Sequence, residues 1–168
     1  MSARRDADTS ILLAGLKVLV VDDSANMREL LVALLNAMGI SDVTCAKDGD
    51  AGLEYFEHAT PDLVITDGMM QPMTGYAMTS AIRALNDNGV SGEVKRSDVP
   101  VLMLSGHSEP EIVKWARDEG VTDYIVKPVS PELLYERVLV AISNPTHIVE
   151  TASFRGPSPR RTLPVHEA

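Results

Sequence analysis

The sequence predicts an α/β fold in which a doubly wound, five-stranded parallel sheet carries helices on both of its faces. Short apolar segments rich in valine, isoleucine and leucine alternate along the chain with longer segments of helical periodicity, and the alternation occurs five times. The short segments are apolar almost throughout, which is typical of parallel strands that are covered on both faces. Such regular alternation favours a sheet whose strands are joined by helical crossovers.

The first strand and the first helix are marked by their side-chain patterns. Lys17 opens an unbroken apolar run that ends at Asp22 and Asp23, as expected of a buried strand. In residues 26–38, leucine and methionine recur at the spacing of one face of an amphipathic helix. Gly39 follows directly and is expected to end this helix.

Two further strand–helix pairs follow in the middle of the chain. A short strand is predicted at 43–46, and a helix at 50–58 has its apolar side chains on one side. The apolar run at 63–67 predicts the central strand, and a helix is expected at 75–85. Residues 86–98 are polar and predict a loop that is longer than most connections from a helix to a strand.

The last two pairs complete the pattern. A strand is predicted at 101–104 and a helix at 109–119, which Gly120 is expected to end. A third apolar segment, 124–126, predicts the fifth strand. The final helix, 130–142, opens with Ser-Pro-Glu, in which serine serves as the N-cap and proline occupies the first helical position.

Both ends of the chain lack this alternation. Residues 1–15 are predicted to form an N-terminal leader, with some helical character over 10–16. Residues 16–143 contain all five pairs and are predicted to form one domain. Residues 144–168 are predicted to be a flexible C-terminal tail, because 151–168 are rich in proline, arginine, serine and glycine and have no apolar face.

The composition is that of an ordinary globular domain. Of the 168 residues, 45% are hydrophobic and 23% are charged. The apolar runs are too short to cross a bilayer and the N-terminus has no apolar stretch of signal-peptide length, so no membrane insertion is expected. The single cysteine, Cys45, excludes an internal disulfide bond and is expected to be a reduced, packed residue, which favours a cytoplasmic location.

The charge of the chain argues against a nucleic-acid partner. The formal net charge is −9, and residues 17–143 alone contain 20 acidic and 10 basic residues, a net charge of −10. A body of this charge is repelled by the phosphates of nucleic acids. The sequence therefore predicts that this domain does not bind DNA.

Polar and charged side chains stand where the predicted strands end. Asp22 and Asp23 follow the first strand and Asp67 ends the third. Ser105 follows the fourth strand and Lys127 the fifth. Ligands of open parallel sheets bind at the carboxyl ends of the strands, so these side chains are expected to lie together at one edge.

This combination of side chains suits a phosphoryl group and a metal ion. Clustered carboxylates repel each other by on the order of 4 kcal/mol per pair at about 4 Å and an effective dielectric constant near 20. Mg²⁺ removes this repulsion and leaves room for phosphate oxygens. Lys127 offers a compact positive charge and Ser105 a hydroxyl donor for a phosphoryl oxygen. Asp67 is the expected nucleophile, since it stands alone on the central strand between the acid pair and the lysine.

Each of these residues also has an ordinary structural interpretation. Adjacent aspartates such as Asp22 and Asp23 are common in loops, and an aspartate such as Asp67 also serves as a cap of a helix or turn. A serine such as Ser105 is often a turn residue. Their joint occurrence at successive strand ends nevertheless favours a functional site.

With these motifs the chain resembles the receiver domain of two-component response regulators over residues 16–143. The resemblance is carried by four motifs, namely Val20-Val21-Asp22-Asp23, Ile65-Thr66-Asp67, Leu104-Ser105-Gly106 and Tyr124-Ile125-Val126-Lys127-Pro128. It implies a flavodoxin-like sheet with the strand order 2-1-3-4-5. It also implies a signalling phosphoprotein that is not an enzyme, apart from catalysing its own phosphorylation and dephosphorylation.

The resemblance implies how the phosphorylation site is built. A histidine kinase would donate its phosphoryl group to Asp67, which becomes an aspartyl phosphate. Mg²⁺ would be bound directly by Asp23, by Asp67 and by the backbone carbonyl of Met69, and largely through water by Asp22. Lys127 would contact the phosphoryl group.

The resemblance also implies a set of switch and tuning residues. Ser105 matches the switch hydroxyl that moves toward the phosphoryl group, and Tyr124 matches the aromatic residue that turns inward with it. Met69 and His107 are expected to flank the phosphoryl group and to tune its hydrolysis, although for His107 an exposed loop residue is the alternative. For Trp115, both core packing and a role in a partner surface stay open.

Two positions depart from the usual pattern of the family. Gln71 stands where a proline is usual and the proline follows at Pro72, so a changed turn is expected after Asp67. Gly106 replaces a more usual alanine next to the switch serine.

Many family members carry a DNA-binding or enzymatic domain, and residues 144–168 are too few for either. The expectation is therefore a stand-alone, single-domain regulator similar to chemotaxis regulators, which acts on a downstream protein target as a monomer or weak dimer. A phosphorelay intermediate or phosphate sink is one alternative. Another is a Mg²⁺-dependent phosphohydrolase with an aspartate nucleophile, but that class is expected to have Asp-x-Asp at the end of the first strand, where Asp22 and Asp23 are adjacent.

Overall fold

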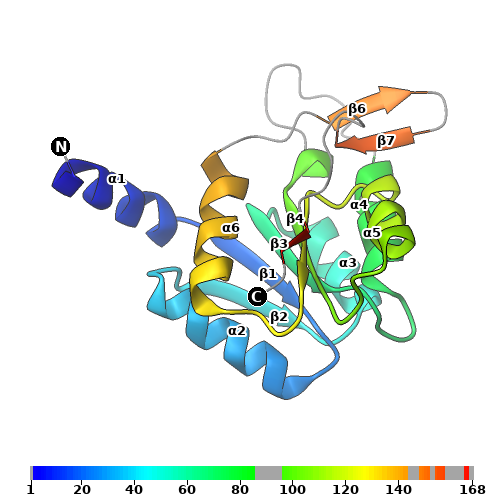
Figure 1. Cartoon of the computed structure of the whole chain (residues 1–168), viewed down its shortest axis with the longest axis horizontal. Helices are drawn as coiled ribbons and strands as arrows, with labels where there is room; N and C mark the ends of the chain where they lie inside the picture. Colours follow the sequence, from blue (N-terminus) through cyan, green and yellow to red (C-terminus); the bar gives the residue numbers. More distant parts are fainter. Residues whose placement is uncertain (1, 86–95, 144–147, 152–153, 158–164, 167–168) are drawn as a thin grey trace.

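The computed structural model describes residues 2–85, 96–143, 148–151, 154–157 and 165–166 and has a layered α/β architecture (Figure 1). A parallel sheet in the order β2-β1-β3-β4-β5-β8 forms its centre. Its strands are β1 (Lys17–Val21), β2 (Asp42–Ala46), β3 (Leu63–Asp67), β4 (Val101–Ser105), β5 (Asp123–Val126) and β8 (Val165–His166). The predicted order 2-1-3-4-5 is confirmed, and the two-residue strand β8 is added beside β5.

Helices cover both faces of the sheet (Figure 1). Helices α2 and α6 lie on one face, and α3, α4 and α5 lie on the other. The helices are α1 (Ser2–Ala14), α2 (Ala25–Ala37), α3 (Gly49–His58), α4 (Gly75–Ala84), α5 (Pro110–Asp118) and α6 (Pro131–Ser143), and the short 3-10 helix η1 (Arg96–Asp98) precedes β4. The five helices predicted to follow the five strands are confirmed as α2 to α6. Within the described part of the chain, none of the helices has the length and apolar character needed to span a membrane.

Successive side chains of the central strands enter two different apolar layers. On β1, Val18 and Val20 pack beneath α2 and α6, whereas Leu19 and Val21 pack beneath α3 and α4. All four are almost fully buried. Burial of an aliphatic side chain of this size contributes about 1.5–3 kcal/mol. A strand that is buried on both faces needs an almost continuous apolar run, which is why the sequence predicted these strands correctly.

The ends of the helices are fixed by local interactions. The side chains of Ser24, Asp48 and Thr74 are N-caps, each accepting a hydrogen bond from the backbone N–H three residues later. Gly39 and Gly120 follow the ends of α2 and α5 with φ angles of 92° and 94°. These angles lie in the left-handed region that favours glycine, so both predicted helix ends are confirmed.

A buried arginine ties α4 to the neighbouring segments. Arg83 is 2% exposed and donates hydrogen bonds to the carbonyl of Gly120 from Nε at 3.0 Å and from Nη2 at 2.9 Å. Its Nη1 donates to the carbonyls of Ser97 and Val99 at 2.6 and 2.8 Å. A buried guanidinium is costly unless its N–H groups are hydrogen-bonded. Arg83 therefore clamps α4 to the end of α5 and to the segment that leads into β4.

Two predictions for the first third of the chain were wrong in part. Helix α1 begins at Ser2, well before the expected range of 10–16, and ends at Ala14. Leu13 near its end packs in the apolar layer of α2 and α6. The N-terminal part of α1 extends away from the sheet (Figure 1). Cys45 is exposed instead of packed, because it lies on β2, an edge strand that is only partly covered.

The C-terminal segment contains short strands where a lack of regular structure was expected. β6 (Ile148–Thr151) and β7 (Phe154–Pro157) pair antiparallel, and the backbone of β7 lies against α5 and α4. β8 pairs with the outer side of β5. Backbone pairing needs no pattern of apolar side chains, so the composition did not reveal it. Of the loop predicted at 86–98, residues 96–98 form η1, and residues 86–95 lie outside the described residues, as does the rest of the predicted tail.

Candidate functional site

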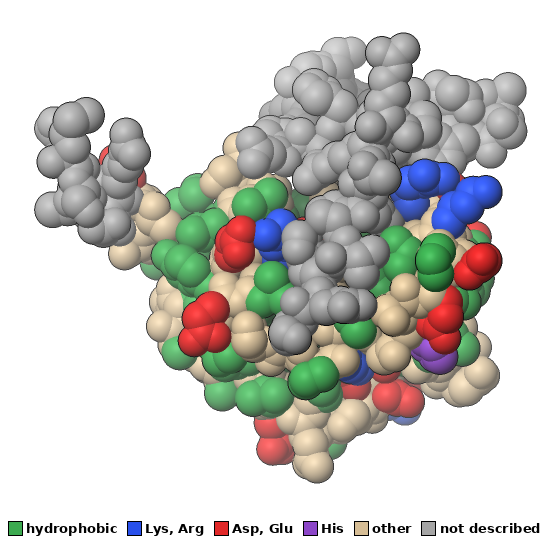
Figure 2. Space-filling model, viewed as in Figure 1, with side chains coloured by type: hydrophobic (Ala, Val, Ile, Leu, Met, Phe, Trp, Pro, Cys, Tyr) green, Lys and Arg blue, Asp and Glu red, His purple; other side chains and the backbone are tan. Residues whose placement is uncertain are grey.

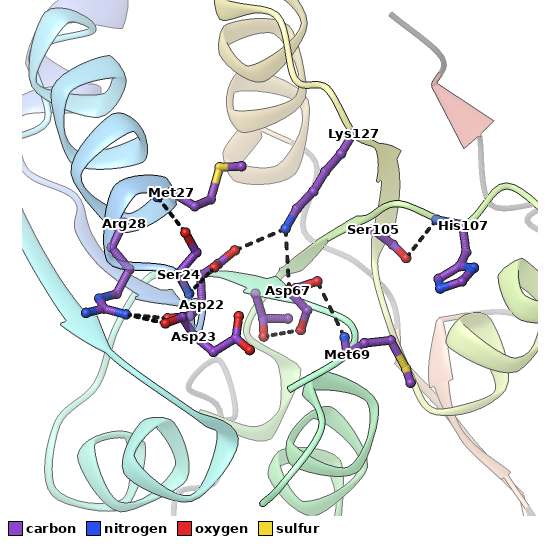
Figure 3. A network of polar contacts seen from close by, with 11 residues as sticks. Asp22, Asp23, Ser24, Met27, Arg28, Asp67, Met69, Ser105, His107 and Lys127 are labelled. Atoms are coloured by element: carbon purple, nitrogen blue, oxygen red, sulfur yellow. Dashed lines mark hydrogen bonds and ion pairs between the residues drawn. The ribbon is translucent and has the colours of Figure 1, made fainter. Parts of the chain in front are cut away.

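The structure brings three carboxylates together at the carboxyl end of the sheet (Figure 3). Asp22 follows β1, Asp23 comes next, and Asp67 is the last residue of β3. One carboxylate oxygen from each lies within 4.8 Å of the others. Asp22 is 1% exposed, Asp67 is half-buried and Asp23 is exposed, so the cluster opens to solvent on the side of Asp23. The sequence placed all three correctly at one edge.

Asp22 is held from two directions. Its Oδ1 accepts a hydrogen bond from the backbone N–H of Ser24 at 2.8 Å, and its Oδ2 lies 3.2 Å from Lys127 Nζ. Nη1 of Arg28 donates to the backbone carbonyls of Asp22 and Asp23 at 2.8 and 3.2 Å. Arg28 thus fixes the turn between β1 and α2, a role for which the sequence carried no recognisable signal.

Lys127 lies between two of the carboxylates. Its Nζ is 3.4 Å from Asp67 Oδ2 as well as 3.2 Å from Asp22 Oδ2 (Figure 3). Its backbone N–H donates to the Ser105 carbonyl at 2.7 Å, which joins the ends of β4 and β5, and the peptide bond to Pro128 is cis. Lys127 therefore lies together with the acidic residues at this edge of the sheet, as expected.

The charges of the cluster match a divalent cation. Three carboxylates face one ammonium group, so the cluster carries two negative charges in excess when all groups are ionised. Carboxylate oxygens are the ligands that Mg²⁺ prefers, and Mg²⁺ keeps several waters, for which the exposed side at Asp23 leaves access. Asp22, Asp23 and Asp67 therefore fit Mg²⁺ by number and by chemistry.

The surroundings of Asp67 favour its protonated form. Burial raises the pKa of the Asp67 carboxyl group above its ordinary value, and the neighbouring Asp22 raises it further. Lys127 and the backbone N–H of Met69 oppose this rise without cancelling it. The ionised form of Asp67 is thus disfavoured by its surroundings when no cation is bound.

We expect Asp67→Asn to stabilise the metal-free protein at neutral pH. Because the pKa of Asp67 is raised by folding, the folded state binds the proton more tightly than the unfolded chain. The free energy of unfolding consequently falls as the pH rises from the ordinary aspartate range through the raised pKa, and the loss persists at neutral pH. Urea unfolding in EDTA checks this: the variant should gain stability at pH 7, and the gain should shrink near about pH 3, below the ordinary pKa. A gain of the same size at both pH values would contradict the assignment.

The predicted switch residues meet on the other side of Asp67. Ser105 is buried, and its Oγ accepts a hydrogen bond from the backbone N–H of His107 at 3.2 Å. Tyr124 is fully buried and donates from its hydroxyl to the His107 carbonyl at 2.8 Å. The imidazole of His107 is half exposed and lies 3.5 Å from Glu109 Oε2. The backbone of His107 therefore joins Ser105 and Tyr124, which the sequence did not indicate.

The loop after Asp67 is closed tightly. The Gly75 N–H donates to the Gly68 carbonyl at 3.0 Å, and a Cβ added at Gly75 would overlap the carbonyl oxygen of Asp67. The side chain of Met69 is exposed, and its N–H donates weakly to Asp67 Oδ1 at 3.4 Å. The peptide bond before Pro72, where the family pattern is altered, is cis. Glycine at position 75 is thus required by close packing under the candidate nucleophile.

Trp115 is partly exposed and partly packed, so it combines features of core packing and of a surface position, the two alternatives that the sequence left open. It is 42% exposed on α5, and its Nε1 donates to Glu119 Oε1 at 3.0 Å. Its ring stacks on that of Tyr76, with the centroids 4.2 Å apart and an interplanar angle of 19°. Tyr76 is the second residue of α4, next to the loop after Asp67, and sequence reasoning missed it because it lies in no recognisable motif.

Comparisons with known proteins agree with this geometry. A family model described as the response regulator receiver domain matches residues 18–139. The chemotaxis protein CheY of Pseudomonas aeruginosa is 30% identical over 123 residues, which cover 73% of this chain and 93% of that protein. The probable transcriptional regulator ycf27 of Porphyridium aerugineum is 37% identical over 122 residues, which cover 73% of this chain and 46% of that protein. The chain thus spans about half the length of the ycf27 relatives that it matches.

Solved structures show the same fold. The chemotaxis protein CheY4 of Vibrio cholerae superposes with a TM-score of 0.66 at 31% identity, covering 75% of this chain and 98% of that one. The signal receiver domain of a signal transduction histidine kinase from Syntrophus aciditrophicus gives a TM-score of 0.66 at 26% identity, covering 82% of this chain and 99% of that one.

Proposed function

Because the chain belongs to the family of response regulator receiver domains, we propose that it accepts a phosphoryl group from a histidine kinase on Asp67 and thereby switches its conformation to control a protein partner. The observation that carries this proposal is the position of Asp67. Its carboxylate stands at the end of the central strand, in one cluster with Asp22 and Asp23 and 3.4 Å from Lys127 Nζ. A nucleophile with acidic metal ligands on one side and a cation on the other is equipped for phosphoryl transfer.

In the proposed reaction an Asp67 carboxylate oxygen attacks the phosphorus atom of the kinase's phosphohistidine. The P–O bond to Asp67 forms as the P–N bond breaks, and the released imidazole keeps the electron pair and takes a proton from solvent. Lys127 exchanges its contact with Asp67 for a phosphoryl oxygen, and Ser105 turns to donate to another. Mg²⁺, held by Asp22, Asp23, Asp67 and the carbonyl of Met69, would supply positive charge to the transferring group. This chain's own residues thus orient the acceptor and neutralise the added charge.

Three further residues would affect the lifetime of the phosphorylated state and the binding of a partner. The exposed side chain of Met69 and the half-exposed His107 are proposed to flank the phosphoryl group and to tune its hydrolysis. Trp115, which is exposed on α5, is proposed to belong to the partner surface. A phosphorylation-dependent change at Ser105 and Tyr124 would reach that surface as a shift between two packings.

The receiver body is proposed to act on proteins and not on DNA, as a monomer or weak dimer in the cytoplasm. Its net charge of −10 over residues 17–143 argues against binding to DNA. In the view of Figure 2, acidic side chains lie at many places on the described surface, whereas basic side chains gather mainly near its upper right. The ycf27 relatives are named as transcriptional regulators, but this chain matches less than half of the length of the first of them.

Phosphoryl uptake from a small donor tests the proposed function. We expect the chain to gain the mass of one phosphoryl group when it is incubated with acetyl phosphate and Mg²⁺, and to gain none in excess EDTA. Hydroxylamine should remove the group, because the bond is an acyl phosphate. Intact-mass spectrometry provides the readout. Release of many phosphates per chain from a phosphomonoester would instead support the phosphohydrolase alternative and overturn the proposal.

A further inference from the structure

The hydroxyl of Tyr76 is buried beside the candidate site and has no hydrogen-bond partner among the described residues. Tyr76 is fully buried, and its ring lies against Gly68, the residue that follows Asp67. A Cβ added at Gly68 would stand only 2.8 Å from the Tyr76 hydroxyl oxygen. A buried hydroxyl that lacks a partner is destabilising, and such groups are rare in folded proteins, so this one calls for an explanation.

Two hydroxyls near Tyr76 are occupied elsewhere in the resting state. Burial raises the pKa of Tyr76, and the hydroxyls of Tyr124 and Ser105 lie close enough to influence it, although neither has bonding geometry toward it. Ser105 Oγ accepts from the His107 N–H at 3.2 Å, and the Tyr124 hydroxyl donates to the His107 carbonyl at 2.8 Å. Tyr76 is thus an unused donor next to an acceptor that is engaged by another group.

On its other side, the buried Tyr76 contacts a residue that is exposed at the surface. Its ring stacks on Trp115, which is 42% exposed on α5. Tyr76 also shares an apolar cluster with Val113, Ala116 and Tyr124, so it joins the end of β3 to the buried face of α5. A small movement of the phenol ring is therefore transmitted to α5 by direct contact.

We propose that Tyr76 is a positioning residue of the switch, whose hydroxyl donates a hydrogen bond to Ser105 Oγ when Ser105 turns from His107 toward a phosphoryl group on Asp67. The proposal rests on the proposed function, because it requires phosphorylation of Asp67. Its hydrogen bonds balance, since the Ser105 O–H donates to a phosphoryl oxygen while the oxygen of Ser105 accepts from Tyr76. The resting state leaves the Tyr76 donor unpaired and the phosphorylated state pairs it, so this hydroxyl favours the phosphorylated state.

Beryllofluoride with Mg²⁺, which mimics an acyl phosphate, provides the test in the full chain. The chain has a single tryptophan, so its intrinsic fluorescence reports on Trp115 alone. We expect Tyr76→Phe to bind beryllofluoride about fivefold more weakly than wild type, the equivalent of the roughly 1 kcal/mol that one such hydrogen bond contributes. We also expect the change in Trp115 emission on binding to be reduced, while thermal stability without beryllofluoride is unchanged or higher, because the lost hydroxyl was unpaired.

Two controls separate this role from a general effect. Tyr135→Phe removes a hydroxyl from an exposed tyrosine on α6 and should leave affinity and emission change as in wild type. In a Ser105→Ala background, Tyr76→Phe should cause no further loss of affinity, because the acceptor is already absent.

Three results would overturn the proposal. If wild type and Tyr76→Phe had the same affinity for beryllofluoride and the same change in Trp115 emission, the proposed hydrogen bond would be contradicted. A loss of affinity matched by a loss of resting stability would indicate a merely structural residue, and an additive loss in the Ser105→Ala background would exclude Ser105 as the acceptor. If wild type itself neither takes up a phosphoryl group from acetyl phosphate nor binds beryllofluoride, the proposed function is wrong. This outcome is distinguishable from the other three.

Discussion

Asp67→Ala is expected to abolish phosphoryl uptake from acetyl phosphate, whereas wild type gains one phosphoryl group. Asp67 is the carboxylate of the cluster that is both positioned and free to react. Both oxygens of Asp22 are engaged, by the Ser24 N–H at 2.8 Å and by Lys127 Nζ at 3.2 Å, and Asp22 is 1% exposed. Among the described residues, the Asp67 Oδ1 by contrast accepts only the long 3.4 Å contact from the Met69 N–H. Intact-mass spectrometry in Mg²⁺ measures the outcome.

The matched control is Asp50→Ala, which removes an exposed carboxylate in the first turn of α3. This variant should be phosphorylated as fully as wild type, because Asp50 is not part of the acidic cluster. Stoichiometric labelling of Asp67→Ala would show that another residue is the acceptor, and the assignment would then be wrong.

Arg83→Met is expected to cause the largest loss of stability. The substitution keeps a long apolar side chain but leaves the carbonyls of Ser97, Val99 and Gly120 without this donor. Each buried group that loses its partner costs about 1–3 kcal/mol, so a fall in the free energy of unfolding on the order of 3 kcal/mol or more is expected. Urea unfolding at pH 7 measures it.

Arg117→Met provides the comparison for Arg83. Arg117 lies on α5 with 25% of its side chain exposed, and it pairs with the more exposed Asp118 at 2.9 Å. Loss of a surface pair of this kind changes stability by about 0.5 kcal/mol or less. If Arg83→Met unfolded at the same urea concentration as Arg117→Met, the clamp described for Arg83 would contribute nothing, contrary to its contacts.

The sheet and the acidic cluster were predictable from sequence for a physical reason. Strands buried on both faces must be apolar throughout, so their ends are visible where the first charged residue appears, as at Asp22 and Asp67. Because the strands are parallel, all such ends meet at one edge. The topology therefore predicts that Lys127 lies near Asp22 and Asp67. The distances themselves are known only from the structure.

Other features depend on contacts between segments that are far apart in the sequence. Arg83 appears in the sequence as an ordinary arginine of an amphipathic helix, and its burial depends on carbonyls that converge from three other positions. The stack of Tyr76 on Trp115 joins α4 to α5, and neither residue belongs to a local motif. Cys45 was misjudged because the covering of an edge strand depends on its neighbours.

The pairing of β8 with β5 also bears on how copies of this protein meet each other. An open edge of a sheet presents free N–H and C=O groups that can template a strand from another molecule. With β8 in place, part of the β5 edge is already occupied by the chain's own backbone. The opposite edge, β2, begins with the exposed charge of Asp42, which disfavours edge-to-edge contact. Strand β8 is therefore expected to limit the pairing of the β5 edge with a strand of another molecule.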